Sequence, residues 1–316
     1  MDHVIAIDVG ATNTRVALVT GEGKICSSLS SSTPAQGGSA DIIASDLTIK
    51  INGLLENAGN ITVSGIGISA AGPVDIHAGA IVNPPNIPYP VIPLVQPLHD
   101  IFGVPVHMVN DCHAGVLGEY TYGGGCDTDN LLYITISTGI GAGAILNGRL
   151  ILGRDGNACE IGHFIVDDRY HHRCGCGHFG HWEGFSSGRH IPRFFRAYCE
   201  YNSLSPAGFG RDTAQEIFAA AGSGNPVALS FIEELGRINA RGFSDVIVAY
   251  DPEVIILDGA VVLRNRDLIL GPMQRHLDHY LKTPEFRFSA LGGRAPLLGA
   301  SVIARGYETG IGSFRP

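Results

Sequence analysis

Four side chains that suit a zinc ion lie close together in the sequence. His163 follows Glu160-Ile-Gly, and Cys174, Cys176 and His181 come soon after it. Imidazole nitrogens and thiolate sulfurs in this number match the closed tetrahedral site of a structural zinc ion. Glycines between them allow a short loop to fold back, so that its donors converge. The sequence therefore predicts a structural Zn²⁺ site with His163, Cys174, Cys176 and His181 as ligands.

Alternatives to this ligand set remain open. The segment could be a Cys/His-rich surface loop that binds no metal. Cys174 and Cys176 could form a disulfide, but a bridge across one intervening residue is strained. His171, His172 and His178 lie nearby and compete for a place in the site, so the fourth ligand is not fixed by the sequence.

Two carboxylates flank this loop. Glu160 precedes it and Glu183 follows it, in Cys-Gly-Cys-Gly-His-Phe-Gly-His-Trp-Glu. A rigid zinc loop would hold the two acids near each other, where they could grip hydroxyl groups of a ligand.

A phosphate-binding turn is predicted near the N-terminus. Residues 3–8 read as a buried strand, residues 9–14 as a small-residue turn and residues 15–20 as a returning strand. Backbone N–H groups and hydroxyls in such a turn form an anion cradle, and Asp8 could hold Mg²⁺ through water. A plain hairpin is the alternative.

The same arrangement recurs about 130 residues later in the chain. Residues 131–136 read as a strand, residues 137–141 as a Gly/Thr turn and residues 142–146 as a strand, before an Asn-Gly hairpin turn. The repetition indicates an internal duplication with two phosphate turns. The predicted phosphate-binding residues are Gly10, Ala11, Thr12, Asn13, Thr138 and Gly139.

A general base is predicted at Asp111. Residues 104–109 read as a strand, and Asn110-Asp111 begins a helix that runs through Glu119. A carboxylate after the carboxyl end of a strand lies where open α/β sheets bind ligands. An N-cap role for Asp111 is the alternative, and the two roles are compatible.

These motifs resemble those of the ROK family of sugar kinases. The shared features are Glu-x-Gly-His, the Cys-x-Cys-Gly-x-x-Gly loop that ends in x-Glu, and Asn-Asp followed by Glu119. His181 stands where the family usually has a third cysteine, and Ala11 stands where it has a glycine. The resemblance covers essentially the whole chain.

The resemblance implies an α/β fold of the two-lobed actin-like ATPase (ribonuclease H-like) type. Such a fold has duplicated mixed β-sheet domains, with the nucleotide in a cleft between them. The expected N-terminal lobe comprises residues 1–111 with a C-terminal helix at about 296–316. The expected C-terminal lobe comprises residues 112–295 and contains the zinc loop and adenosine site.

The implied activity is the ATP-dependent phosphorylation of a hexose primary hydroxyl, glucose first, with Mg²⁺ and with Asp111 as base. Gly259 would lie against adenosine, where the family has a glycine pair and this chain keeps one. The expected sugar-binding residues are Gly72, Asn86, Asn110, Asp111, Glu160, His163 and Glu183.

Other functions stay open. N-acetylmannosamine, fructose or mannose could replace glucose, because discrimination depends on pocket shape around Glu160 and Gly72. Inorganic polyphosphate could replace ATP. A non-catalytic sugar sensor, or a ROK-type repressor without its DNA-binding domain, is the alternative from a different class.

Bulk properties limit the partners. A chain of 316 residues suits two domains. Its net charge of -9 argues against nucleic acid, which requires a basic face. Seven cysteines without regular spacing outside the loop, with no signal peptide and no apolar run long enough for a membrane span, indicate a cytoplasmic protein. The resemblance implies a homodimer or homotetramer.

The remaining elements follow from hydrophobic periodicity and from proline and glycine positions. Residues 84–97 are proline-rich and predict an extended loop or a linker. Helices are expected at 41–56, 212–221, 226–250 and 296–307, and strands at 63–69 and 253–257.

Overall fold

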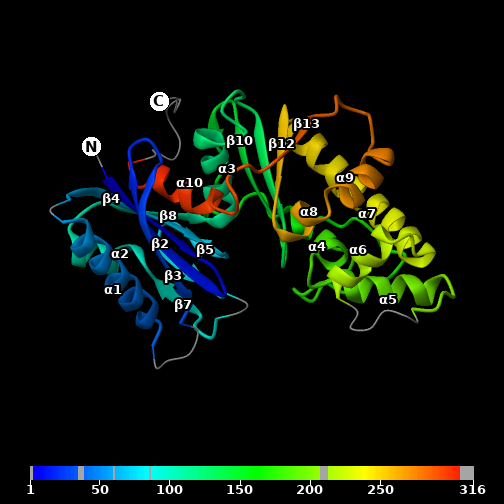
Figure 1. Ribbon diagram of the computed structural model, residues 1–316, viewed down its shortest axis with the longest axis horizontal. Coiled ribbons are helices and arrows are strands. Elements are labelled where there is room, and N and C mark those ends of the chain that lie inside the picture. The colour runs from blue at the N-terminus through cyan, green and yellow to red at the C-terminus, as the bar shows by residue number, and fades with distance from the viewer. Residues whose placement is uncertain (1–2, 35–38, 60, 85–86, 207–212, 307–316) are drawn as a thin grey trace. The chain divides into compact units, whose positions relative to one another are not determined.

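The computed structural model describes residues 3–34, 39–59, 61–84, 87–206 and 213–306 (Figure 1). The chain divides into two compact units. The first unit consists of residues 1–133, 143–159 and 289–316, and the second unit of residues 134–142 and 160–288.

The first unit is built on a mixed sheet with the strand order β3-β2-β1-β4-β8. Strands β1, β2 and β3 pair antiparallel, whereas β1, β4 and β8 pair parallel. Within the described residues, the five strands are β1 (His3–Val9), β2 (Asn13–Thr20), β3 (Ile25–Ser32), β4 (Val63–Ala70) and β8 (Val106–Asn110).

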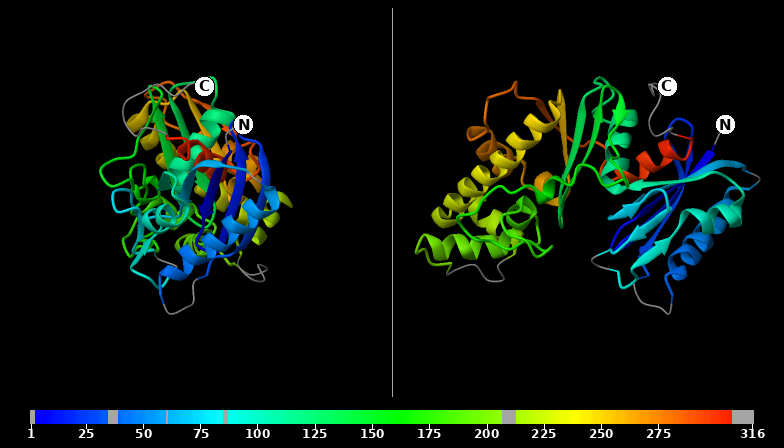
Figure 2. Two further views of the ribbon diagram at one scale, coloured as in Figure 1. Left: turned by 90° about the vertical axis from the view of Figure 1, so that its left-hand side faces the viewer. Right: turned by 180° about the vertical axis from the view of Figure 1, so that it is seen from behind.

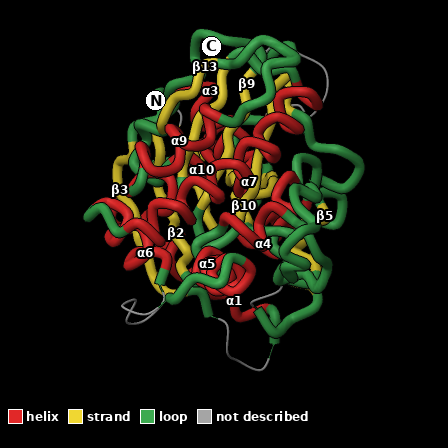
Figure 3. The backbone as a smooth tube through the Cα atoms, turned by 90° about the vertical axis from the view of Figure 1, so that its right-hand side faces the viewer, coloured by secondary structure: helices red, strands yellow, loops and turns green. Residues whose placement is uncertain are grey.

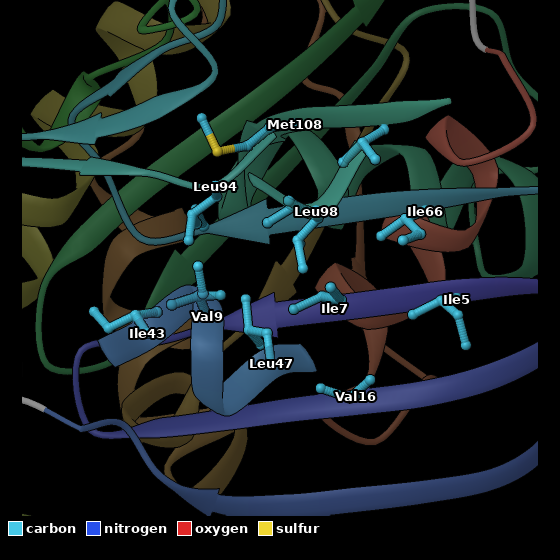
Figure 4. Close-up of a cluster of buried hydrophobic side chains, with 14 of the residues drawn as sticks. Ile5, Ile7, Val9, Val16, Ile43, Leu47, Ile66, Leu94, Leu98 and Met108 are labelled. Carbon is cyan, nitrogen blue, oxygen red and sulfur yellow. The ribbon is translucent and has the colours of Figure 1, made fainter. Parts of the chain in front are cut away.

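Both faces of this sheet are covered. Ile5, Ile7 and Val9 of β1 pack with residues of α1 (Asp41–Ala58) and α2 (Val95–Phe102), as Figure 4 shows for α1. The alternate residues of β1 pack against α10 (Ala295–Ile303), which lies on the opposite face (Figures 1 and 2). Since side chains alternate across a strand, an apolar β1 can be buried on both sides.

Glycines allow α10 to approach its neighbours closely. A Cβ atom at Gly299 would overlap the carbonyl oxygen of Ala114 in α3 (Asp111–Tyr122), and one at Gly67 in β4 would overlap that of Ala300. This packing keeps α3 in the first unit. The sequence placed the boundary after Asp111, but the unit also includes residues 112–133 and 143–159.

A small antiparallel sheet extends the first unit. Its order is β5-β6-β7, with β5 at Val74–Asp75, β6 at Ala80–Val82 and β7 at Val91–Pro93. Strand β7 and the start of α2 lie in the proline-rich segment. The expectation of an extended loop or linker there was incomplete, because Pro93 ends β7 and Pro97 lies in the first turn of α2, where its missing N–H breaks no hydrogen bond of the helix.

The second sheet has the order β11-β10-β9-β12-β13, and the chain crosses between the units within β9 and within β10. Strands β10 and β11 pair antiparallel, and β12 and β13 pair parallel. Their bounds are β9 (Leu131–Ile136), β10 (Ile140–Leu146), β11 (Arg149–Leu150), β12 (Val254–Asp258) and β13 (Glu285–Phe288).

Helices are the main elements of the second unit besides its strands, and Figure 3 shows several of them as neighbouring tubes. The longest, α7 (Pro226–Tyr250), begins after the N-cap Asn225 and has the predicted bounds. The others are η1 (Ile161–His163), α4 (Trp182–Ser186), α5 (Ile191–Tyr201), α6 (Ala214–Gly222), α8 (Ala260–Arg264) and α9 (Arg266–Arg275). Within the described residues, none of the helices has the length and apolar character needed to span a membrane.

The substitution Gly299→Ala should destabilise the first unit. Its methyl group would force α10 away from α3, and overpacking of this kind costs about 1–3 kcal/mol. Gly53→Ala in α1 is the matched control, because a Cβ there meets only Leu29, at 4.0 Å. Thermal unfolding followed by circular dichroism should show a lower melting temperature for Gly299→Ala alone. Equal melting temperatures for both variants would contradict the close packing.

Candidate functional site

The carboxyl ends of β1, β4 and β8 lie side by side in the first unit. Val9 is opposite Ala70, and Ala70 is opposite Asn110. The segments that follow these strands carry the predicted residues Gly10, Gly72 and Asp111. Ligands bind at this edge in open parallel α/β sheets.

Asp8 is buried and already paired. Its Oδ2 accepts hydrogen bonds from Arg15 Nε at 3.1 Å and Nη2 at 2.6 Å, and its Oδ1 accepts one from Ser69 Oγ at 3.0 Å. A carboxylate has about four lone-pair sites, so little capacity remains. This favours a water-mediated contact of Asp8 with Mg²⁺ over direct ligation.

Arg15 and Ser69 were not predicted from the sequence. Each lies opposite Asp8 in a neighbouring strand. The signal for Arg15 was a cation in the strand directly after the turn, at the position that pairs with Asp8 when the hairpin closes.

The backbone N–H of Gly10 is hydrogen-bonded within the first turn. The Gly10 N–H donates to Asn13 O at 3.0 Å, and the Thr33 hydroxyl donates to Gly10 O at 2.7 Å. The expected donor role of the Gly10 N–H is therefore not available in this conformation. Ala11 is half-buried, while Thr12 and Asn13 are exposed.

Asn110 and Asp111 occupy different positions at the start of α3. Asn110 is the N-cap of α3, and its Oδ1 accepts from Cys112 N at 2.8 Å. The capping role considered for Asp111 thus belongs to Asn110, and Asp111 is the first residue of the helix. A helix N-terminus stabilises an ionised carboxylate.

Gly72 lies against this pair. A Cβ atom there would be 2.7 Å from Asn110 Nδ2. A larger residue at this position would displace the Asn110 side chain. Asn86, also predicted to bind sugar, lies outside the described residues.

The cysteines and histidines of the second unit lie on a folded-back loop. Ile165 bridges His181, and Arg173 bridges Phe179, both antiparallel. Gly177 and Gly180 have positive φ values of 98° and 79°, which the reversals of the loop require. We call residues 163–181 the Cys/His hairpin.

The hairpin brings together the four predicted zinc ligands. One donor atom from each of His163, Cys174, Cys176 and His181 lies within 4.8 Å of the others. His181 Nδ1 is 3.2 Å from Cys176 Sγ and 3.1 Å from His163 Nδ1. Bonds of 2.0–2.3 Å in a tetrahedral zinc site separate its ligands by roughly 3–4 Å, so the donor set fits the ion.

None of the three competing histidines belongs to this group of four, although the ring of His178 lies 5.8 Å from that of His181. The ring of His172 packs against Phe185 and Phe194, and that of His171 stacks on Phe179. Cys174 and Cys176 are free thiols, so the alternative disulfide is not formed.

Protonation in the hairpin follows burial. Burial lowers the pKa of His181, which favours the neutral imidazole that binds metal. Burial raises the pKa of the Cys174 thiol to about 11 in the metal-free protein. Burial also raises the pKa of Glu160; His163, whose Nε2 is 4.0 Å from its carboxylate, acts in the opposite direction.

Glu183 connects the hairpin to the second turn. Its Oε2 accepts from Ile140 N at 3.0 Å, and its Oε1 is 4.0 Å from Cys174 Sγ. The neighbouring Trp182 is fully buried, and its Nε1 donates to Asn239 of α7 at 2.8 Å. This anchor fixes the start of α4 and with it the carboxylate.

The second turn, residues 137–139, is held by backbone contacts. Gly188 N donates to Ser137 O at 2.7 Å, and Thr138 is exposed. Gly259 has a φ of 98°, and a Cβ atom there would overlap the Ile136 carbonyl. Ala260 begins α8, so the one glycine that the chain retains is at the position where the geometry demands it.

Asp167 fastens the hairpin to α7. Its buried carboxylate accepts from Arg169 Nε at 2.7 Å and from Arg241 Nη1 at 2.6 Å. Arg241 also donates to Val166 O at 2.9 Å.

Comparisons with known proteins agree with these motifs. The sequence model of the ROK family matches residues 4–306. A glucokinase of Pyrobaculum calidifontis is 35% identical over 311 residues, covering 98% of this chain and 96% of the relative. An N-acetylmannosamine kinase of Citrobacter koseri is 31% identical over 307 residues, covering 96% and 98%.

A solved structure is similar over nearly the whole chain. It is a ROK family glucokinase from Streptomyces griseus in complex with glucose and AMPPNP, with a TM-score of 0.75 and 31% identity. The match covers 96% of this chain and 99% of that one.

Removing the Asp167 carboxylate should loosen the hairpin. Asp167→Ala removes the carboxylate shared by Arg169 and Arg241. Arg169 keeps its ion pair with Glu234, Arg241 keeps its bond to Val166 O, and both side chains reach water, with 39% and 48% exposure. We expect a loss of about 2–3 kcal/mol in the free energy of unfolding. This is less than the usual cost of breaking a buried ion pair, because both arginines reach water. The exposed neighbour Asp168 provides the control Asp168→Ala. Urea unfolding that fails to separate the two variants would contradict the anchoring role.

Proposed function

The chain belongs to the ROK family and is an ATP-dependent sugar kinase with the actin-like ATPase fold, and we propose that it phosphorylates glucose at its primary hydroxyl. Support for glucose comes from the similarity to curated glucokinases and to a glucokinase structure that contains glucose and AMPPNP. Glucose 6-phosphate and ADP are the products.

The proposed mechanism is supported by the positions of Asn110 and Asp111 at the start of α3. Asn110 is the N-cap of α3, and Asp111 is the first residue of the helix. Asp111 accepts the proton of the sugar hydroxyl as that oxygen attacks the γ-phosphate in line. Positioning and charge neutralisation supply most of the remaining catalysis in phosphoryl transfer.

The two turns bind the nucleotide. Ala11, Thr12 and Asn13 offer donors to the phosphates from the first turn, and Thr138 and Gly139 from the second. Asp8 would hold a Mg²⁺ ion through water, and the ion would neutralise charge on the phosphates. Gly10 supplies the space that the first turn needs, and Gly259 packs against adenosine.

The sugar ligands are the set predicted from the resemblance, namely Gly72, Asn86, Asn110, Asp111, Glu160, His163 and Glu183. His163 is suited to two tasks, because its Nδ1 lies in the metal cluster and its Nε2 faces Glu160 at 4.0 Å. The Cys/His hairpin would hold a structural Zn²⁺ through His163, Cys174, Cys176 and His181, and this would keep the His163 ring in place. N-acetylmannosamine is the second candidate substrate, supported by the similarity to the Citrobacter koseri enzyme.

Asp111→Asn should abolish most of the turnover and keep sugar binding. Loss of a general base costs about 10²–10⁴-fold in kcat. The measurement is an ADP-release assay over glucose, N-acetylmannosamine, fructose and mannose, with calorimetric binding of the sugar to the variant. Asp100→Asn, which removes an exposed carboxylate in α2, is the control.

The outcomes separate the alternatives. Turnover of N-acetylmannosamine alone keeps the base and replaces the sugar. Unchanged kcat in Asp111→Asn contradicts the base, and tight binding without turnover of any sugar in wild type contradicts the kinase.

Metal analysis should find one zinc ion per chain. Cys176→Ser removes a thiolate and should lower the zinc content and the melting temperature. His181→Cys should retain the zinc, since thiolate and imidazole both suit the ion. Cys26→Ser, a substitution of an exposed free cysteine in β3, is the control. A zinc content of zero in the wild type purified with zinc in all buffers would refute the site.

A further inference from the structure

The side chain of Asn157 binds both backbone polar groups of Val74, the first residue of β5, two positions after Gly72. Asn157 Nδ2 donates to Val74 O at 2.7 Å, and Val74 N donates to Asn157 Oδ1 at 2.9 Å. A carboxamide presents a donor and an acceptor side by side, as a neighbouring strand would. Asn157 therefore takes the place of a strand partner for Val74.

Adjacent contacts reinforce this pairing. Ile76 N donates to Asp155 O at 3.3 Å, and His77 Nε2 is 3.0 Å from Arg154 O. Gly156, with a φ of 86°, approaches so closely that a Cβ atom would overlap the Ile76 side chain. The two segments thus lie against each other over several residues, with side-chain bonds from Asn157 and His77.

The pairing fixes the position of Gly72. A Cβ atom on Gly72 would lie 2.7 Å from Asn110 Nδ2 and 3.8 Å from Asn157 Oδ1. The Gly72 backbone is therefore confined between two amides, one of which precedes Asp111. Any shift of the loop changes the space beside Asn110.

Asn157 also stands shortly before Glu160 in the chain. Between them, Cys159 is buried and has a φ of 67°. A left-handed conformation is unfavourable for a residue with a Cβ atom and persists only where its surroundings impose it. The bonds of Asn157 to Val74 anchor the backbone that enters this conformation.

We propose that Asn157 is a positioning residue that sets sugar specificity, by holding the Gly72 loop and the backbone that leads to Glu160. The inference rests on the proposed role of Gly72 and Glu160 in sugar binding. By limiting movement of the loop, Asn157 makes the site favour a hexose without a bulky substituent over one that carries an N-acetyl group.

The test compares Asn157→Ala with wild type. Loss of two hydrogen bonds should raise the KM for the sugar about tenfold, while kcat and the KM for ATP change less than about twofold. The ratio of kcat/KM for glucose to that for N-acetylmannosamine should fall as the loop relaxes.

Asn157→Asp supplies a readout that a purely structural role would not give. Its carboxylate still accepts from Val74 N, but when ionised it opposes Val74 O. Once protonated it can donate to that oxygen. The sugar KM of Asn157→Asp relative to wild type should therefore fall towards one as pH is lowered from about 8 to 5, while the ratio for Asn157→Ala stays flat.

Asn130→Ala is the matched control. Asn130 is also half-buried in the first unit, and its Oδ1 accepts from Asn147 N at 3.0 Å. A wild-type sugar KM in both Asn157 variants would overturn the proposal. So would an equal rise of KM for sugar and ATP together with a lower melting temperature.

The assay uses the hexose that the wild type phosphorylates fastest. An incorrect assignment of glucose then appears in the wild type, and an incorrect role for Asn157 appears only in the variants. If the wild type turns over no hexose, calorimetric binding of glucose to the same variants replaces KM.

Discussion

The parallel register of β1, β4 and β8 is the constraint on which the candidate site of the first unit depends. Val9, Ala70 and Asn110 lie opposite one another, so the segments after the three strands emerge at one edge. Apolar side chains cover both faces of β1, and a shift by one residue would exchange the sets that face α1 and α10. Burial on two sides therefore fixes the location of Asp8, Gly72 and Asp111.

Side chains replace strand partners where the regular elements end. Asn110 caps α3, Thr33 closes the first turn, and Glu183 accepts from Ile140 N beside the second. Asn157 does the same for Val74. Loops that leave a sheet retain unpaired N–H and C=O groups, and a buried group without a partner is costly. Polar residues near such a site therefore hold the backbone in place, in addition to any role in binding a ligand.

The Cys/His hairpin shows how a local motif acquires a wider setting. Its four donors are close in sequence, and glycine turns bring them together. Its attachment is not local, because Asp167 pairs with Arg241 and Trp182 with Asn239, both on α7. The hairpin thereby fixes Glu183 next to the second turn.

The sequence alone determined the elements with strong periodicity or local motifs. Strand β9 and helix α7 have the predicted bounds, and the four donors of the hairpin converge as expected. These features depend on neighbours in the chain, which a sequence displays directly. The activity was inferred from the family resemblance, because the motifs of the family occur in this chain with similar spacing.

Only the tertiary structure decided the contacts between distant segments. Arg15 and Ser69 bind Asp8, and Asn110 is the N-cap of α3. The Gly10 N–H is bonded within its own turn and is not available as a donor to a phosphate, and Asn157 binds Val74. The tertiary structure also kept α3 in the first unit, because glycines permit its contact with α10. Such pairings follow from strand register and close packing, which arise when the chain folds and leave no periodic signal in the sequence.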